Sequence, residues 1–274
     1  MIEFAPAIGL TPPLRARLQA WSVRMAEAAG LRGLATFEFL LDVADGETAV
    51  FIEANARLQV EHTVTEAVTG LDLVQIQLRL AGGETLADVG LADGPPPVRG
   101  NAVQLRVNLE RIAADGSVSG GGGVIARYEP PSGPGVRVDG AGFAGYRPSP
   151  GFDSMIAKVI VHSPDENVRA VLARAGRAAA EFRLDGVDSN LALLRAILEA
   201  PEVAAGAADT SFVEDRLPVF LARAVELAPP ADTAAAEAAT VTVQAPPGSL
   251  TVAAPLRGTI VGFEVAVGDI VRAG

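Results

Sequence analysis

Residues 51–66 read FIEANARLQVEHTVTE, and the character of the chain changes within this stretch. It opens with apolar residues that are typical of a β-strand. Residues 53–63 then carry two carboxylates, two amides, an arginine and one of the two histidines of the chain. One interpretation is a solvated loop that follows an edge strand. The other is a site that holds a metal ion and an anion together.

The strand at residues 48–55 is expected to form a hairpin with residues 35–43. Both runs are rich in strand-forming residues, and Asp45-Gly46 between them favours a tight turn. The opposite face of this hairpin is expected to be buried, because it carries an apolar set: Phe37, Phe39, Phe51 and Ile52.

The expected turn brings three polar side chains to one face of the hairpin. Glu38 lies opposite Glu53, and Asn55 shares the face of Glu53 because side chains alternate along a strand. Like charges directly opposite each other destabilise a sheet. Two carboxylates and an amide oxygen, however, suit a hard cation such as Mg²⁺. On spacing alone, the alternative that both glutamates face water stays open.

Composition excludes several classes of function. The 274-residue chain carries a net charge of −11, whereas a nucleic-acid groove needs concentrated positive charge, so no nucleic-acid partner is expected. The absence of cysteine removes disulfides and cysteine-ligated zinc. No apolar run approaches the ~20 residues of a membrane span, and no signal sequence follows Met1, so a cytoplasmic protein without membrane contact is expected. Lys158 is the only lysine of the chain, and a structural ion pair explains its presence more readily than a catalytic role.

Helix and strand signals alternate along the rest of the chain. Apolar residues at helical spacing follow the capping signal at Thr11, and a second helical stretch starts near Val64 and restarts at Asp72. Further helices are expected from Ser163-Pro164-Asp165 through Phe182 and over residues 190–199. Between them lie short strands with Gly/Pro turns. The run SGGGGV at residues 119–124 lacks a following Gly-Lys-[Ser/Thr], so it indicates a turn between strands and not a phosphate loop.

Residues 51–83, FIEANARLQVEHTVTEAVTGLDLVQIQLRLAGG, resemble the motif of biotin carboxylases, the ATP-grasp component of biotin-dependent acyl-CoA, pyruvate and urea carboxylases. The resemblance covers roughly residues 1–216 and continues through four further stretches: NAVQLRVNLE (101–110), PPSGPGVRVDG (130–140), AGYRPSPGFDSMIAKVI (144–160) and RLDGVDSNLALL (183–194). Residues 254–274 are similar to the opening strands of a biotinyl carrier domain.

The resemblance implies a role for each polar residue of the opening motif. Glu38, Glu53 and Asn55 match the ligands of a Mg²⁺ (or Mn²⁺) ion that bridges ATP phosphates. This assignment agrees with the geometry expected of the hairpin.

The other matched residues handle bicarbonate and biotin. Arg57 matches the arginine that holds bicarbonate and the phosphate leaving it, Gln59 and Val60 match residues that position bicarbonate, and Glu61 matches its general base. Arg106 matches the arginine that stabilises the biotin enolate. Such roles are chemically reasonable, because bicarbonate attacks ATP only after losing a proton, and a guanidinium bonds two oxygens at once. The plainer alternative for Arg57 and Glu61, four residues apart, is an ion pair on a helix surface.

The implied fold is α+β with four parts. These are the C-terminal half of an ATP-grasp domain (1–95), a biotin carboxylase C-terminal domain (96–216), an Ala/Pro-rich linker (217–248) and a truncated, β-rich, lipoyl-like biotinyl domain (249–274). Two residues depart from the family pattern: Thr63 stands where proline is commoner, and Asn101 where histidine is frequent.

The resemblance implies an ATP-dependent ligase that carboxylates biotin with ATP, Mg²⁺ and bicarbonate through carboxyphosphate, for transfer to an acyl-CoA or similar acceptor. The expected partners are a biotinyl carrier domain, a carboxyltransferase domain or subunit and, as one candidate assembly, a second copy of the chain.

The chain is expected to be an internal piece of a larger carboxylase. The family's ATP lid with its lysines, and the lysine that accepts biotin, match no residue of this sequence. The isolated piece is therefore expected to be inactive. The alternative is a non-catalytic remnant or an assembly module that pairs with a separate polypeptide.

Overall fold

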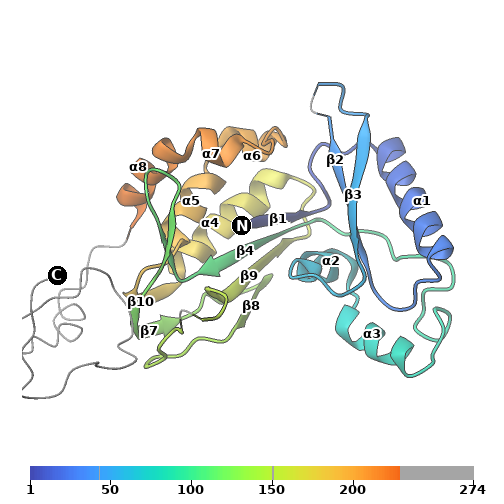
Figure 1. The fold of residues 1–274 in the computed structure, drawn as a ribbon, viewed down its shortest axis with the longest axis horizontal. Coiled ribbons are helices and arrows are strands. Elements are labelled where there is room, and N and C mark those ends of the chain that lie inside the picture. The colour runs from blue at the N-terminus through green and yellow to red at the C-terminus, as the bar shows by residue number, and fades with distance from the viewer. Residues whose placement is uncertain (43, 150, 229–274) are drawn as a thin grey trace, which may run out of the picture. The chain divides into compact units, whose positions relative to one another are not determined.

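The computed structural model describes residues 1–42, 44–149 and 151–228, which all belong to one compact unit that spans residues 1–239. Helices and antiparallel strands alternate along this part of the chain, which confirms the expected mixed α and β content (Figure 1). The expected biotinyl domain at residues 249–274 and most of the expected linker lie outside the described residues.

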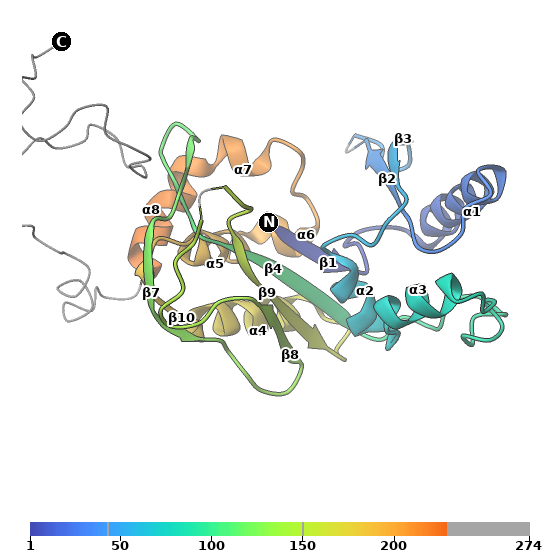
Figure 2. The ribbon, with the colours of Figure 1, turned by 60° about the horizontal axis from the view of Figure 1, so that its bottom comes forward.

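A four-stranded antiparallel sheet organises the described chain. Its strand order is β1-β4-β9-β8, so the N-terminal strand pairs with a strand about a hundred residues later (Figure 2). The four strands have these bounds: β1 (Ile2–Ala5), β4 (Asn101–Asn108), β8 (Val136–Gly140) and β9 (Met155–Ser163). Smaller two-stranded sheets pair β5 (Glu110–Ile112) with β6 (Val118–Gly120), and β7 (Gly123–Glu129) with β10 (Arg183–Val187).

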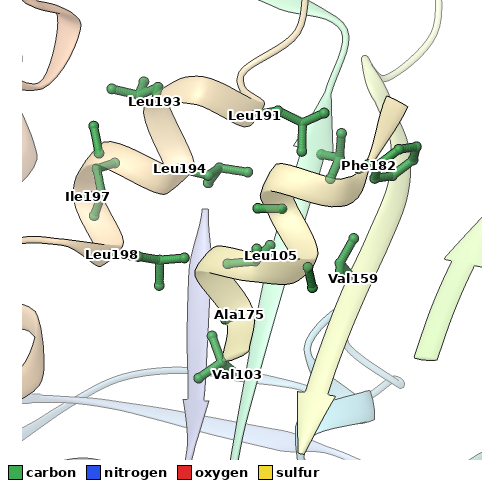
Figure 3. Close-up of a cluster of buried hydrophobic side chains, with 14 of the residues drawn as sticks. Val103, Leu105, Val159, Ala175, Phe182, Leu191, Leu193, Leu194, Ile197 and Leu198 are labelled. Atoms are coloured by element: carbon green, nitrogen blue, oxygen red, sulfur yellow. The ribbon is translucent and has the colours of Figure 1, made fainter. Parts of the chain in front are cut away.

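One face of the four-stranded sheet forms the main hydrophobic core. Val103, Leu105 and Val107 of β4 and Val159 and Val161 of β9 alternate along their strands and are 0% exposed, as expected for one buried face of a sheet. Helices α4 (Val168–Glu181) and α5 (Leu191–Leu198) cover this face (Figure 3). Ala175 and Leu194 are both 0% exposed, so the helices pack tightly onto the strands.

The opposite face of the same sheet is polar and lies against helix α2 (His62–Thr69). It presents Gln104 and Arg106 of β4 beside Lys158 of β9, with only a small apolar cluster around Val64. Helix α2 is therefore held to the sheet both by this apolar cluster and by polar contacts of Thr63 and Glu66. Helix α3 (Leu73–Ala81) follows it, capped by Asp72 as expected.

The expected hairpin forms, but its turn is not the tight one. Strands β2 (Thr36–Leu41) and β3 (Ala49–Asn55) are joined by residues 42–48, in which the Asp45 carboxylate accepts hydrogen bonds from Glu47 and Thr48. A register shift beside Phe39 compensates for the longer connection, so Glu38 still pairs with Glu53.

The expected burial of the other hairpin face is wrong in part. Phe51 and Ile52 are 44% and 49% exposed, because in the described chain this hairpin has only two strands and a single helix beside it. That helix is α1 (Pro12–Ala28), and its Trp21 lies 6.1 Å from Phe39 between ring centroids. Helix α1 begins after the expected cap, Thr11.

The C-terminal part of the described chain is more helical than expected. Residues 217–227 were expected to open a linker, but they form helix α8 (Leu217–Leu227), whose Leu217 and Phe220 are buried against the core. Its apolar residues recur at helical spacing, which outweighs the alanine and proline content. The short helices α6 (Pro201–Ala205) and α7 (Phe212–Asp215) precede it. Helix α4 begins at Val168, capped by Asn167, and so starts later than the Ser-Pro-Asp signal indicated.

The glycine run at residues 119–124 spans the end of β6 and the start of β7, and residues 121–122 connect the two strands. A Cβ at Gly121 would stand 2.4 Å from the carbonyl oxygen of Asp188, so close approach of backbone explains the glycine. Within the described ranges, no helix has both the length and the apolar character needed to cross a membrane.

Candidate functional site

The hairpin brings Glu38, Glu53 and Asn55 together on one face, as the sequence predicted. Glu38 and Glu53 are direct cross-strand partners. The side-chain nitrogen of Asn55 donates to both carboxylates, at 3.0 Å to Glu38 Oε1 and 2.7 Å to Glu53 Oε1. The amide thus offsets the repulsion that two opposed carboxylates would otherwise suffer.

This cluster fits a divalent cation in its choice of donors. Mg²⁺ takes carboxylate and amide oxygens, and both carboxylates already converge on one point. To bind the ion, the Asn55 amide would turn so that its oxygen replaces its nitrogen. Among the described residues no group of three His, Cys, Asp or Glu side chains forms a metal-like cluster, so the cation would rely on this amide.

The loop after β3 carries the next expected residues. Arg57 donates from Nη1 to Gln59 Oε1 at 3.2 Å, and the Nδ1 atom of His62 lies 2.8 Å from the Gln59 carbonyl oxygen. Helix α2 begins only at His62, so Arg57 and Glu61 do not share a helix surface. In the part of the chain that the structure describes, no ion pair joins them, and the plainer alternative for these two residues is therefore wrong.

Arg106 reaches this loop from the centre of the sheet. Its Nη2 donates to Glu61 Oε2 at 3.1 Å, although 45 positions of sequence separate the two residues. On its other side, Arg106 Nε lies 2.6 Å from Glu3 Oε1. The angle of that second contact does not meet hydrogen-bond geometry, so the attraction is mainly that of opposite charges. One guanidinium therefore sits between two carboxylates.

A buried hydrogen-bond chain beneath this ion pair was not foreseen from the sequence. The Thr63 hydroxyl donates to the side-chain oxygen of Gln104, and both residues are 0% exposed. The side-chain nitrogen of Gln104 donates in turn to Glu3 Oε2 at 2.9 Å. The only signal in the sequence was Thr63 itself, which departs from the family pattern.

Ion pairs between β8 and helix α2 extend the polar face. Arg137 binds Asp139 through two nitrogens, at 2.8 and 2.9 Å, and donates to the buried Glu66 at 2.7 Å. Partial burial raises the pKa of Asp139, but the hydrogen bonds and charges of Arg137 and Lys158 outweigh burial and hold that pKa below its ordinary value.

Two family models match the chain. Residues 1–89 match the ATP-binding domain of the carbamoyl-phosphate synthase L chain, and residues 104–215 match the biotin carboxylase C-terminal domain. The chain is 41% identical over 224 residues to human mitochondrial pyruvate carboxylase, which is 81% of this chain and 18% of that protein. It is 37% identical to the biotin carboxylase of Halalkalibacterium halodurans, with 47% of that protein covered. The chain thus spans less than half the length of these curated relatives.

Solved structures of biotin-dependent carboxylases are also similar to this chain, which again covers only part of each. The biotin carboxylase domain of a single-chain bacterial carboxylase is similar with a TM-score of 0.77 and 44% identity, covering 83% of this chain and 51% of that one. A single-chain, multi-domain long-chain acyl-CoA carboxylase is similar with a TM-score of 0.77 and 46% identity over 81% of this chain and 24% of that one. The biotin carboxylase domain dimer of Hydrogenobacter thermophilus 2-oxoglutarate carboxylase, in complex with MgADP, ADP and bicarbonate, has a TM-score of 0.73 and 33% identity, covering 80% of this chain and 47% of that one.

Proposed function

Because the chain belongs to the biotin carboxylase family over most of its described residues, we propose that it carries the bicarbonate-activating part of a biotin carboxylase site. The whole enzyme would use ATP and bicarbonate to carboxylate biotin. The observation that carries this proposal is the contact of 3.1 Å between Arg106 and Glu61, since it joins two motifs that the reaction needs in one small volume.

In the proposed reaction Glu61 accepts the proton of bicarbonate. An oxygen of the resulting dianion then forms a bond to the γ-phosphorus of ATP, the bond to ADP breaks, and carboxyphosphate results. Arg57 would hold two oxygens of bicarbonate, helped by Gln59 and by the backbone of Val60. A bound divalent ion would supply compensation for the negative charge on the phosphate oxygens.

Arg106 would act on the second substrate. When biotin loses its ureido N–H proton to the phosphate that carboxyphosphate releases together with CO₂, negative charge develops on the ureido carbonyl oxygen, and a guanidinium beside it stabilises that charge. The deprotonated nitrogen then forms a bond to the carbon of CO₂, which gives carboxybiotin. In the structure this guanidinium is held by Glu61 and Glu3. Biotin would therefore replace one of these carboxylates as a partner of Arg106.

The remaining parts and partners follow from the same proposal. We divide the chain into an ATP-grasp part at residues 1–95 and a biotin carboxylase C-terminal part at residues 96–216, which the ranges of the two matching families support. A biotinyl carrier segment at residues 249–274, a carboxyltransferase and a homodimer are the partners that we propose. Support for the dimer is the dimer described for the Hydrogenobacter thermophilus relative.

A second candidate function is an assembly module that pairs with another polypeptide. The hairpin favours it, because the cross-strand partners Leu40 and Val50 share a face and are 49% and 60% exposed. Large apolar side chains gathered in this way mark an interaction surface. The two candidates differ in the ligands that the purified chain binds.

The test is a titration of the purified chain with Mn²⁺ in ¹³C-labelled bicarbonate. Mn²⁺ bound at the hairpin should shorten the ¹³C relaxation time of bicarbonate held by Arg57, because Asn55 and Arg57 are near neighbours in the chain. Glu53→Gln should weaken Mn²⁺ binding at least about tenfold. Arg57→Met should keep Mn²⁺ binding but abolish the effect on bicarbonate.

Glu47→Gln is the matched control, because Glu47 lies in the connection between the two strands and its side chain is exposed. The proposal fails if Glu53→Gln binds Mn²⁺ as tightly as the unmodified chain, or if Arg57→Met leaves the bicarbonate relaxation unchanged. A chain that binds neither ligand would favour the assembly module.

A further inference from the structure

Lys158 occupies a central position on the polar face of the sheet. It lies on strand β9, where its backbone partners are Arg106 of β4 on one side and Asp139 of β8 on the other. Cross-strand partners point to the same face, so the row places two cations side by side. The side chain of Lys158 is 12% exposed, which is unusual for a lysine.

The ammonium of Lys158 ends at the backbone of the loop that carries the site residues. Its Nζ donates to the carbonyl oxygen of Val60 at 3.2 Å, a contact between residues 98 positions apart. Its carboxylate neighbour, Asp139 Oδ2, is 3.5 Å away, whereas Arg137 binds the same carboxylate at 2.8 and 2.9 Å. The hydrogen-bond partner of Lys158 is thus the loop, and Asp139 mainly balances its charge.

The peptide unit held in this way is the one that joins Val60 to Glu61. A peptide group is planar, so fixing its carbonyl oxygen also fixes the direction of the Glu61 N–H. Hydrogen bonds between a charged donor and a carbonyl are about twice as strong as neutral ones. The loop has few other ties to the sheet through its own residues, apart from the contact of Glu61 with Arg106.

We propose that Lys158 is a positioning residue that fixes the 57–61 loop on the sheet through the Val60 carbonyl, with Asp139 as its counter-ion. Arg106 and Lys158 then hold neighbouring points of the same loop, the first by the Glu61 side chain and the second by the backbone. The part of this inference that concerns bicarbonate rests on the proposed function. The part that concerns the loop rests on the contacts alone.

The first test follows amide hydrogen exchange in the full chain. The N–H groups of His62 and Val64 donate to the carbonyls of Gln59 and Glu61 at 3.3 and 3.2 Å, so they report how well the loop is ordered. Lys158→Met should speed their exchange roughly tenfold, the factor expected from one charge-assisted hydrogen bond. Lys158→Arg, which keeps a cationic donor, should restore most of the protection.

Arg174→Met is the matched control. Arg174 also donates to backbone carbonyls, those of His162 and Pro134, but it makes no contact with the 57–61 loop. Its removal should leave exchange of His62 and Val64 unchanged. If Lys158→Met stays folded and exchanges like the unmodified chain at these amides, the proposal is overturned. If Lys158→Met does not fold, Lys158→Gln decides by the same criterion, since it keeps an N–H donor without the charge and should give intermediate protection.

The second test separates positioning from a general loss of structure. Lys158→Met should weaken the binding of sodium bicarbonate about tenfold while leaving Mn²⁺ binding at the hairpin unchanged, because Lys158 touches the loop and not Glu38, Glu53 or Asn55. Equal loss of both ligands would overturn the proposal, as it would indicate a merely structural role. If the unmodified chain binds no bicarbonate, the proposed function fails, and the exchange experiment alone then judges Lys158.

Discussion

At the scale of single residues, the site depends on partners that are distant in sequence. The sequence alone predicted that Glu38 faces Glu53, since hairpin register follows from local rules. It did not predict that Arg106 would contact Glu3 as well as Glu61, because that contact depends on how β1 pairs with β4. Such pairing between remote strands has no short-range signal.

Thr63 shows how a departure from a family pattern can be structural. Its hydroxyl supplies the hydrogen bond that buried Gln104 requires. Thr63→Val keeps the shape but leaves the Gln104 oxygen without a donor, so the free energy of unfolding should fall by about 1–3 kcal/mol. Chemical denaturation of both proteins would measure this difference in the free energy of unfolding. Thr65→Val is the control, because Thr65 is exposed on the same helix, and an equal effect of both substitutions would contradict the role given to Thr63.

The stability of the connection between β2 and β3 should depend on whether the Asp45 carboxylate is protonated. Hydrogen bonds from Thr48 and Glu47 lower the pKa of Asp45 from the ordinary 3.8 to about 2. A depressed pKa means that the carboxylate stabilises the folded connection above pH 3.8, and that this contribution is lost as the pH falls towards 2. Carboxyl chemical shifts and the amide shifts of Thr48 should move together in that window. Movement of Thr48 with a midpoint at 3.8 or above would contradict the inference.

At the scale of elements, helix α2 connects the site loop to the sheet. Most helices were predictable from apolar periodicity and caps, as α1, α3 and α5 show. Helix α8 was missed because its alanine and proline content resembles a linker, and its burial depends on contacts with α5. The prediction of a tight hairpin turn was wrong, because composition does not reveal the register shift beside Phe39.

Glu66 should govern how firmly α3 is attached. Its carboxylate is buried, accepts from the Leu73 amide at the start of α3 at 2.8 Å and binds Arg137 of β8 at 2.7 Å. Glu66→Ala should speed amide exchange in α3 and lower the free energy of unfolding by about 1.5–3 kcal/mol, the range for hydrogen bonds to charged groups.

Glu84→Ala is the control for that substitution. Glu84 also pairs with an arginine, Arg79, but both side chains are well exposed, and such pairs contribute about 0–1 kcal/mol. If α3 exchanges no faster in Glu66→Ala than in Glu84→Ala, Glu66 does not anchor the helix.

At the scale of the whole molecule, one sheet serves two purposes. Its apolar face builds the core with α4 and α5, and its polar face carries Arg106 and Lys158 towards the loop after β3. The resemblance gave the family and the residues that match its motif. It did not reveal that Lys158 contacts that loop, because the roles that the resemblance implies concern only residues that bind the metal ion, bicarbonate or biotin.

The chain as given should not accept biotin. Lys158 is the only lysine, and its ammonium is held between the Val60 carbonyl and Asp139. Incubation with a biotin protein ligase, ATP and biotin should leave the mass of the chain unchanged, while a biotinyl carrier domain in the same mixture gains the label. A biotin label on Lys158 would show that this residue is far more accessible than its burial implies.

The central claim is that the loop of Glu61 and the strand of Arg106 together carry biotin carboxylase chemistry. The most direct measurement replaces the matching segment of the Halalkalibacterium halodurans biotin carboxylase with residues 1–215 of this chain and follows bicarbonate-dependent phosphate release from ATP in the presence of free biotin. The chimera should release phosphate, and Glu61→Gln should slow that release about 10²–10⁴-fold, as expected for loss of a general base. A folded chimera whose Glu61→Gln variant releases phosphate as fast as the unmodified chimera would contradict the claim.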